Sequence, residues 1–229
     1  MRKNGEVFEE IEFSIERGYI VEETVSGRMQ GDNVGVIRIE EFDKKTPEQF
    51  KNKFEELVNQ GADRFVFDVR YNPGGDLNAI TEILDMLLPE GPIIRIIDRY
   101  GEESVVESDA DCVDLPFAVI TNGDTASAAE LFTSALRDYK KAVTVGETTY
   151  GKGTMQSVIP LPDGSAVCMT TQTYCPPISD SYDGVGIKPD IESFIDEEYS
   201  NTSILKLTYE QDKQLQTAVE AVLNGSVEE

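Results

Sequence analysis

The sequence predicts an α/β fold. Apolar runs typical of buried strands occur at residues 64–70, 116–123 and 142–147, and amphipathic helical patterns lie between them. Strand and helix patterns that alternate in this way predict a sheet covered by helices. The chain has 229 residues, of which 39% are hydrophobic, so it can build the core of one domain or slightly more.

The helix expected at residues 46–61 has the clearest boundaries. Thr46 suits the N-cap, Pro47 suits the first helical position, and Gln49 completes a capping box. Gly61 ends the helix. The apolar stripe of this helix consists of Phe50, Phe54, Leu57 and Val58.

Weaker patterns predict the remaining elements. Strands with a turn at Arg17–Gly18 are expected within residues 7–25, followed by a loop at 27–33 and a strand at 34–42. Apolar stripes at residues 77–88 and 212–223 predict helices. Residues 93–108 and 159–174 predict hairpins, the second around Asp163–Gly164.

The composition excludes several classes of protein. A formal net charge of −24 argues against binding to nucleic acids and to anionic membranes. The chain has no apolar run long enough for a transmembrane helix, and its first residues lack the apolar region of a signal peptide. It has no histidine, and its three cysteines, expected as small buried side chains, form no CxxC motif. We therefore expect neither a metal nor a cofactor.

Ser127, in the stretch TNGDTASAAELF, has two interpretations. It forms a capping box with Glu130, and this motif alone favours a structural N-cap. A serine at a strand-to-helix turn is also well placed to act as an exposed nucleophile, because free N–H groups of the first helical turn face a developing oxyanion. Without histidine in the chain, such a serine needs a different base.

Lys152, in the stretch GETTYGKGTMQ, is the candidate base. The stretch resembles a Walker A loop, but Gly153 stands where that loop requires serine or threonine, which argues against a nucleotide hydrolase. Glycines on both sides of Lys152 allow the backbone to pass close to another segment. A lysine amine can replace histidine as a base where a dry, local environment favours its neutral form.

Four blocks of the chain resemble the catalytic region of the C-terminal processing (tail-specific) serine peptidases. They are VGVIRIEEF, FVFDVRYNPGGDLNAITEILDMLLP, the run from VITNGDTASAAELF to GKGTMQSVIPL, and GVGIKPDI, which together span about residues 34–191. The resemblance implies that Ser127 is the nucleophile, Lys152 the base and Gln156 the residue that orients the lysine. It also implies a Clp/crotonase-like spiral core of strands and helices, with an N-terminal strand region and a C-terminal helix.

The implied activity is that of a serine endopeptidase that cleaves polypeptides near their C-terminal regions. For the oxyanion, we expect backbone N–H groups of Ala128 and of Gly74 or Gly75 to serve as donors. The partner is a polypeptide substrate, without nucleic acid or membrane insertion, and a homo-oligomer is compatible with the sequence. The full-length protein is expected outside the cytoplasm, in the cell envelope or secreted.

Members of the family usually carry a PDZ module, whose carboxylate-binding loop is missing from this chain. We expect residues 1–26 to be the exit segment of such a module, residues 27–195 the catalytic core and residues 196–229 a helical tail. An inactive or gated peptide-binding scaffold of the same fold remains an alternative. A crotonase-type acyl-CoA enzyme is a weaker one, because it needs no Ser/Lys/Gln set at this spacing.

Overall fold

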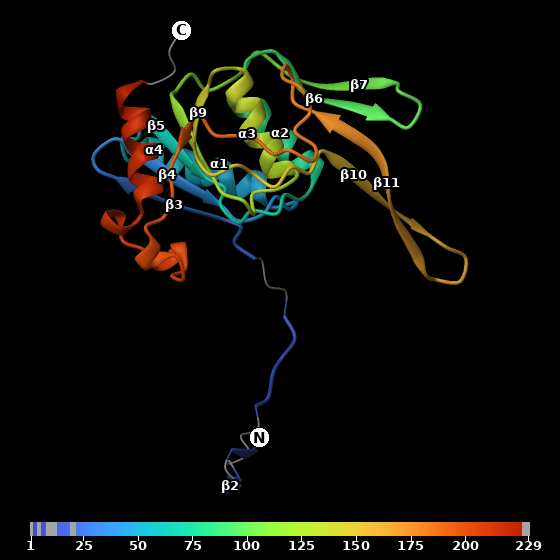
Figure 1. Ribbon diagram of the computed structural model, residues 1–229, viewed down its shortest axis with the longest axis horizontal. Coiled ribbons are helices and arrows are strands. Elements are labelled where there is room, and N and C mark those ends of the chain that lie inside the picture. Colours follow the sequence, from blue (N-terminus) through green and yellow to red (C-terminus); the bar gives the residue numbers. More distant parts are fainter. Residues whose placement is uncertain (1, 4–5, 8–12, 19–21, 226–229) are drawn as a thin grey trace.

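The structure, a computed structural model, describes residues 2–3, 6–7, 13–18 and 22–225. Its body contains a six-stranded, mostly parallel sheet with helices on both faces, and a four-stranded antiparallel sheet lies beside it (Figure 1). The predicted α/β class is confirmed.

The six-stranded sheet has the strand order β12-β9-β8-β5-β4-β3. Neighbouring strands from β12 to β4 are parallel, and only the edge strand β3 runs antiparallel to its neighbour β4. The strands are β3 (Val25–Gln30), β4 (Val34–Ile39), β5 (Arg64–Asp68), β8 (Phe117–Thr121), β9 (Ala142–Gly146) and β12 (Ile191–Glu192).

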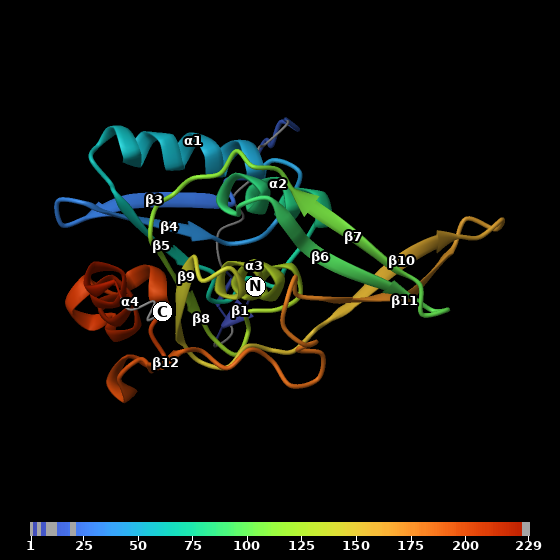
Figure 2. The same ribbon diagram turned by 90° about the horizontal axis from the view of Figure 1, so that it is seen from above.

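The central strands β4, β5, β8 and β9 are apolar and buried at nearly every position, so both faces of the sheet are covered. Helices α1 (Thr46–Asn59), α2 (Leu77–Leu87) and α3 (Ala128–Asp138) cover one face. Helix α4 (Lys213–Asn224) packs against β5, β8 and β9 on the other face (Figure 2). Alternate residues of each strand therefore enter two separate cores, as expected for a parallel sheet between helices.

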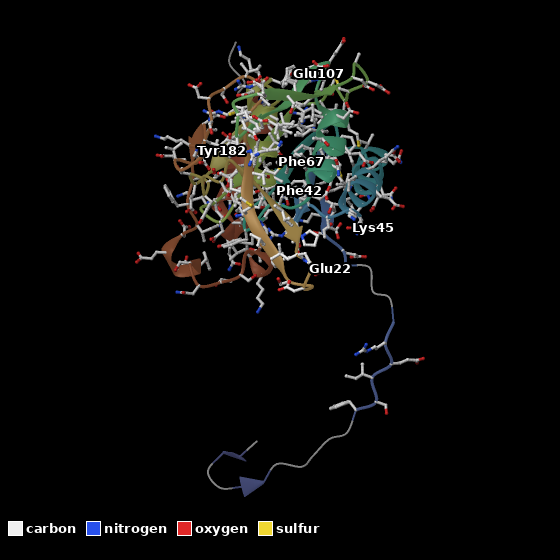
Figure 3. All side chains as sticks on the ribbon, turned by 90° about the vertical axis from the view of Figure 1, so that its right-hand side faces the viewer. Glu22, Phe42, Lys45, Phe67, Glu107 and Tyr182 are labelled. Carbon is white, nitrogen blue, oxygen red and sulfur yellow. The ribbon has the colours of Figure 1, made fainter. Side chains whose placement is uncertain are left out.

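Phenylalanine rings fill the larger of the two cores. The Phe67 ring lies 5.1 Å from the Phe117 ring and 5.5 Å from the Phe132 ring, measured between centroids, and Phe42 lies 5.9 Å from Phe132. Figure 3 shows Phe42 and Phe67 inside the body, whereas Glu107 lies at its periphery. These contacts join β5, β8 and α3, the elements that hold the turns described below.

The second sheet has the order β10-β11-β6-β7 and is antiparallel throughout. It consists of the two predicted hairpins, β6 (Gly91–Asp98) with β7 (Glu103–Ser108) and β10 (Thr154–Pro160) with β11 (Ala166–Cys175). Figure 1 shows the β10–β11 hairpin running away from the body to a free tip.

The N-terminal region differs from the prediction. Residues 27–33 were expected as a loop, but Gly27–Gln30 belong to β3, which pairs with β4 across the turn at residues 31–33. An edge strand pairs on one side only, so it tolerates the polar residues that suggested a loop. Within the expected strands at residues 7–25, residues 13–18 and 22–24 form none, and residues 8–12 and 19–21 lie outside the described residues.

The predicted capping box of α1 is also wrong. The carboxylate of Asp43 accepts hydrogen bonds from the N–H groups of Lys45 and Thr46, and Thr46 is already helical. The side-chain oxygen of Gln49 accepts from the N–H groups of Thr24 and Val25. A tertiary contact with the start of β3 therefore replaces the local contact within the helix.

A buried ion-pair network fixes the C-terminal helix to the sheet. The guanidinium of Arg70, 2% exposed, contacts Asp68 at 2.7 Å and Asp212 at 2.8 Å. Burial alone would raise the pKa of Asp68, but the charges of Arg70 and Arg38 outweigh it and lower that pKa. Asp212 also accepts from the N–H of Leu215 and so begins α4. The segment expected as a helical tail is therefore packed on the sheet.

We expect Asp212→Ala to lower the free energy of unfolding by about 3–5 kcal/mol, because it leaves the Arg70 charge partly unpaired in the interior. Urea unfolding at neutral pH measures this change. Asp196→Ala is the control, since Asp196 is 56% exposed and lies 3.8 Å from Lys213; its effect should stay below about 0.5 kcal/mol. Equal effects of the two substitutions would contradict a stabilising role of the buried network.

Candidate active site

A pocket lies at the carboxyl edge of the six-stranded sheet. The turn after β5, the turn after β8 and the loop after β9 meet there, since these three strands are parallel neighbours. The pocket has a volume of about 390 Å³. Five of the six residues predicted for the site line it, namely Gly75, Ser127, Ala128, Lys152 and Gln156. Gly74 lies directly behind them, against the Cβ of Ser127 and the backbone nitrogen of Ala128.

Ser127 occupies a strained turn between β8 and α3. Its φ of 57° and ψ of −120° are unusual for a residue with a side chain, whereas an N-cap residue ordinarily has extended dihedrals. Strain of this kind costs about 1–3 kcal/mol and is typical of functional turns. The side chain lies half-buried in the wall of the pocket. The predicted capping contact with Glu130 is present, because the N–H of Ser127 donates to the Glu130 carboxylate at 2.8 Å. The dihedrals of Ser127 are nevertheless those of a strained turn rather than of an ordinary N-cap.

The backbone of Lys152 is anchored at both of its hydrogen-bonding groups. Its N–H donates to Glu130, and its carbonyl accepts a 2.7 Å bond from the hydroxyl of Tyr174. A Cβ on the preceding Gly151 would lie 2.7 Å from the N of Gly186, so a glycine is required there. The chain continues into strand β10 rather than into a helix, which excludes a Walker A loop.

The buried carboxylate of Glu130 joins the serine turn to the lysine loop. One oxygen accepts 2.8 Å bonds from the N–H groups of Ser127 and Lys152. The other accepts from the N–H of Gly151 at 2.6 Å and from the Thr149 hydroxyl at 2.5 Å. The sequence interpretation gave Glu130 only a capping role. The capping pattern could not predict the three contacts with the lysine loop, because those partners lie 19 to 22 residues away in sequence.

Two residues that line the pocket, Gly75 and Ala128, have backbone N–H groups available for a substrate. Within the described residues, neither Gly75 N nor Ala128 N donates to an acceptor. The N–H of Gly74 is engaged, because it donates to the side chain of Asn72 at 2.8 Å. A Cβ on Gly75 would lie 2.0 Å from the carbonyl oxygen of Phe42, so that segment can run there only with glycine. Gly75 therefore remains the better donor candidate of the two glycines.

Tyr174 is a residue of the pocket that the sequence analysis missed. Its hydroxyl oxygen lies 2.7 Å from the carbonyl of Lys152 and 3.3 Å from Ser127 Oγ. Burial raises the pKa of Tyr174, so the phenol keeps its proton near neutral pH. A phenol has one proton and a carbonyl only accepts, so the shorter contact uses that proton. At the longer contact the tyrosine hydroxyl is also the donor and Ser127 Oγ the acceptor, so this second, weaker bond shares the same proton. A single tyrosine in a strand gives no local signal of this contact.

The structure brings the predicted side chains to one pocket but does not pair all of them. Within the described part of the chain, no hydrogen bond joins Lys152 Nζ to Ser127 Oγ or to the Gln156 carboxamide. Gln156 lies at the start of β10 and is exposed. Of the cysteines, Cys175 is buried as expected, whereas Cys168 is exposed on β11.

Residues 33–193 match Peptidase family S41. The chain belongs to this family. It is 33% identical over 219 residues to a carboxyl-terminal-processing protease of Synechocystis sp., which covers 93% of this chain and 50% of that protein. It is 37% identical over 182 residues to carboxyl-terminal-processing peptidase 1 of Arabidopsis thaliana chloroplasts, covering 76% of this chain and 37% of that protein.

Among solved structures, the photosystem II D1 C-terminal processing protease matches this S41 chain with a TM-score of 0.69 and 29% sequence identity. The match covers 76% of this chain and 49% of that one. The chain thus spans half the length, or less, of these relatives. None of the helices in the described part is both long and apolar enough to cross a membrane.

We expect Glu130→Gln to lower the free energy of unfolding by about 1–3 kcal/mol, because the amide group of glutamine meets backbone donors that need an acceptor. Thermal unfolding measures the loss, and hydrogen exchange at the amides of Gly151 and Lys152 should become faster. Glu55→Gln is the control, since Glu55 is an exposed residue of α1. Unchanged amide exchange in Glu130→Gln would refute the coupling of the two segments through this carboxylate.

Proposed function

We propose that this chain is the catalytic core of a serine endopeptidase that cleaves polypeptides near their C-terminal regions. The observation that carries the proposal is the common pocket, in which a strained serine, a lysine between glycines and two unused N–H groups lie together. The names of the relatives support the substrate class. A location of the full-length protein outside the cytoplasm is part of the proposal. The same proposal includes a polypeptide substrate and a homo-oligomeric state for the full-length protein. It also includes the domain boundaries expected from the sequence, with the catalytic core at residues 27–195.

In the proposed reaction, Lys152 acts as the general base. The neutral amine takes the hydroxyl proton of Ser127 while Ser127 Oγ attacks a peptide carbonyl, and it then gives a proton to the leaving amine. Gln156 accepts a hydrogen bond from the lysine amine and orients it. Water cleaves the resulting ester by the same proton transfers and frees the serine.

The oxyanion of the tetrahedral intermediate is stabilised by the N–H groups of Ala128 and Gly75. Both groups face the pocket, and the N–H of Ala128 belongs to the first turn of α3, where the helix dipole favours negative charge. Donors of this kind typically contribute a factor of about 10²–10³ to the rate.

We expect Ser127→Ala and Lys152→Ala each to reduce cleavage of an unstructured polypeptide by at least about 10³-fold, because each removes a group that forms or breaks bonds. Mass spectrometry of the products over time measures cleavage. Ser200→Ala and Lys188→Ala, which change exposed residues away from the pocket, serve as matched controls. Cleavage that persists in both active-site variants would refute the assignment.

A gated form of the same site is a second candidate, favoured by the contact between Ser127 Oγ and Tyr174. In this arrangement the Tyr174 hydroxyl donates to Ser127 Oγ and holds it, and the serine side chain has to rotate before it can give its proton to Lys152. Substrate binding would supply the rotation, so the resting enzyme reacts slowly. If the serine side chain never rotates, the chain is the inactive peptide-binding scaffold that the sequence left as an alternative.

We expect Tyr174→Phe to increase, by about 2- to 10-fold, the rate at which a small sulfonyl fluoride modifies Ser127, since one hydrogen bond of about 0.5–1.5 kcal/mol is removed. Intact-mass measurement follows the modification. Tyr182→Phe is the control, because the Tyr182 hydroxyl lies 3.5 Å from the backbone oxygen of Ser127 rather than from its Oγ. A rate that is unchanged or lower in Tyr174→Phe would argue against gating by this contact.

A further inference from the structure

The outer part of the β10–β11 hairpin, residues 156–171, forms a two-stranded arm. Strand β11 pairs with β6 only from Gln172 to Cys175, so the residues before Gln172 pair with β10 alone. Figures 1 and 2 show the arm reaching beyond the body. A two-stranded ribbon is at best marginally stable in water by itself, so the arm is well suited to gain from a partner.

The arm is apolar and almost uncharged. It contains one charged residue, Asp163, although 28% of the residues of the chain are charged. Exposed apolar side chains occupy both of its strands, with exposures from 40% to 70% for Val158, Ile159, Leu161, Val167 and Met169. Loss of charge together with exposed apolar groups is typical of the centre of an interaction surface.

The arm also begins inside the candidate active site. Strand β10 starts two residues after Lys152, and its first residues Thr154, Met155 and Gln156 line the pocket that holds Ser127. Strand β10 is an edge of its sheet, so one side of its backbone has no strand partner within the described residues. An extended chain that pairs with this edge would run directly from the arm to the pocket.

From these observations we propose that the arm is an exosite that binds an extended, apolar stretch of the unfolded polypeptide substrate at a distance from the cleaved bond. The inference rests on the proposed function. Pairing with the edge of β10 supplies main-chain hydrogen bonds, and the exposed side chains of the arm select apolar residues. A chain with a net charge of −24 repels acidic polypeptides over most of its surface, whereas the uncharged arm does not.

The distance along the arm separates this exosite from the pocket. Residues in a strand advance by about 3.3 Å each, so Ile159 lies roughly 10 Å and Leu161 roughly 17 Å along the strand from Gln156. A peptide with two residues on each side of the cleaved bond fills the pocket without reaching that far. The arm therefore affects long substrates and leaves such short ones unaffected.

The test uses the double variant Ile159→Thr/Val167→Thr, which replaces a directly paired couple of exposed side chains. Threonine keeps the β-branched shape that suits a strand but removes apolar surface. Val58→Thr/Val105→Thr is the matched control, since these valines are 41% and 44% exposed and lie on α1 and β7. Circular dichroism and thermal unfolding verify that each variant folds like the parent.

Binding is measured first, in the Ser127→Ala background, by fluorescence anisotropy with a labelled, unstructured polypeptide of about 60 residues rich in leucine and valine. We expect the arm variant to raise Kd by about 3- to 10-fold and the control variant to leave Kd within 2-fold. An unchanged Kd in the arm variant overturns the proposal. Because this readout needs no cleavage, it decides the role of the arm even if the proposed catalytic function fails.

Cleavage assays with the protein in which Ser127 is intact then show whether the substitutions in the arm act on the arm or on the pocket. The arm variant should raise KM for the long polypeptide by a similar factor, while kcat/KM for a four-residue peptide that spans the mapped cleavage site stays within 2-fold. Equal losses for both substrates would place the effect in the pocket and overturn the proposal. Sedimentation of the protein alone gives the remaining alternative: a dimer of the parent that dissociates in the arm variant would show that a second copy, not the substrate, covers the arm.

Discussion

The site depends on one topological constraint, the parallel and adjacent course of strands β5, β8 and β9. Parallel strands end at the same edge of a sheet, so the segments that follow them must meet there. The glycine turn, the serine turn and the lysine loop are separated by 25 to 53 residues in sequence, but each follows one of these strands. The helices on both faces hold the sheet rigid, and the positions of these segments are fixed with it.

Within this arrangement, hydrogen bonds to Glu130 fix the serine turn relative to the lysine loop. A buried carboxylate is costly unless its oxygens accept several hydrogen bonds, and here four donors from the serine turn and the lysine loop supply them. Its position in the first turn of α3 adds the favourable helix dipole. The same carboxylate thus couples the backbone of the candidate nucleophile to that of the candidate base.

Charged residues are distributed unevenly along the chain. Arg70 is paired with Asp68 and Asp212 in the interior, and these ion pairs bind the start of α4 to the sheet face opposite α1, α2 and α3. The remaining acidic excess lies on a surface that keeps the protein apart from other acidic molecules. The arm, which starts at the pocket, contains a single charged residue, Asp163, and this contrast with the acidic composition of the chain favours an approach by an apolar polypeptide at that place.

The sequence by itself determined the α/β class, most of the elements and the family. Long apolar runs, amphipathic stripes and turn residues act locally, so patterns such as that of residues 64–70 or of the Asp163–Gly164 hairpin could be read without the fold. The resemblance of four sequence blocks to the C-terminal processing peptidases also singled out Ser127 and Lys152, whereas the serine motif alone favoured a helix cap. Local patterns failed where a tertiary partner replaced a local one, as at Gln49, which bonds to the start of β3, and at β3 itself, which is stabilised by pairing with β4. Only the tertiary structure decided that Glu130 joins two distant segments and that Tyr174 contacts Ser127, because each of these contacts depends on atoms brought together from segments far apart in the chain.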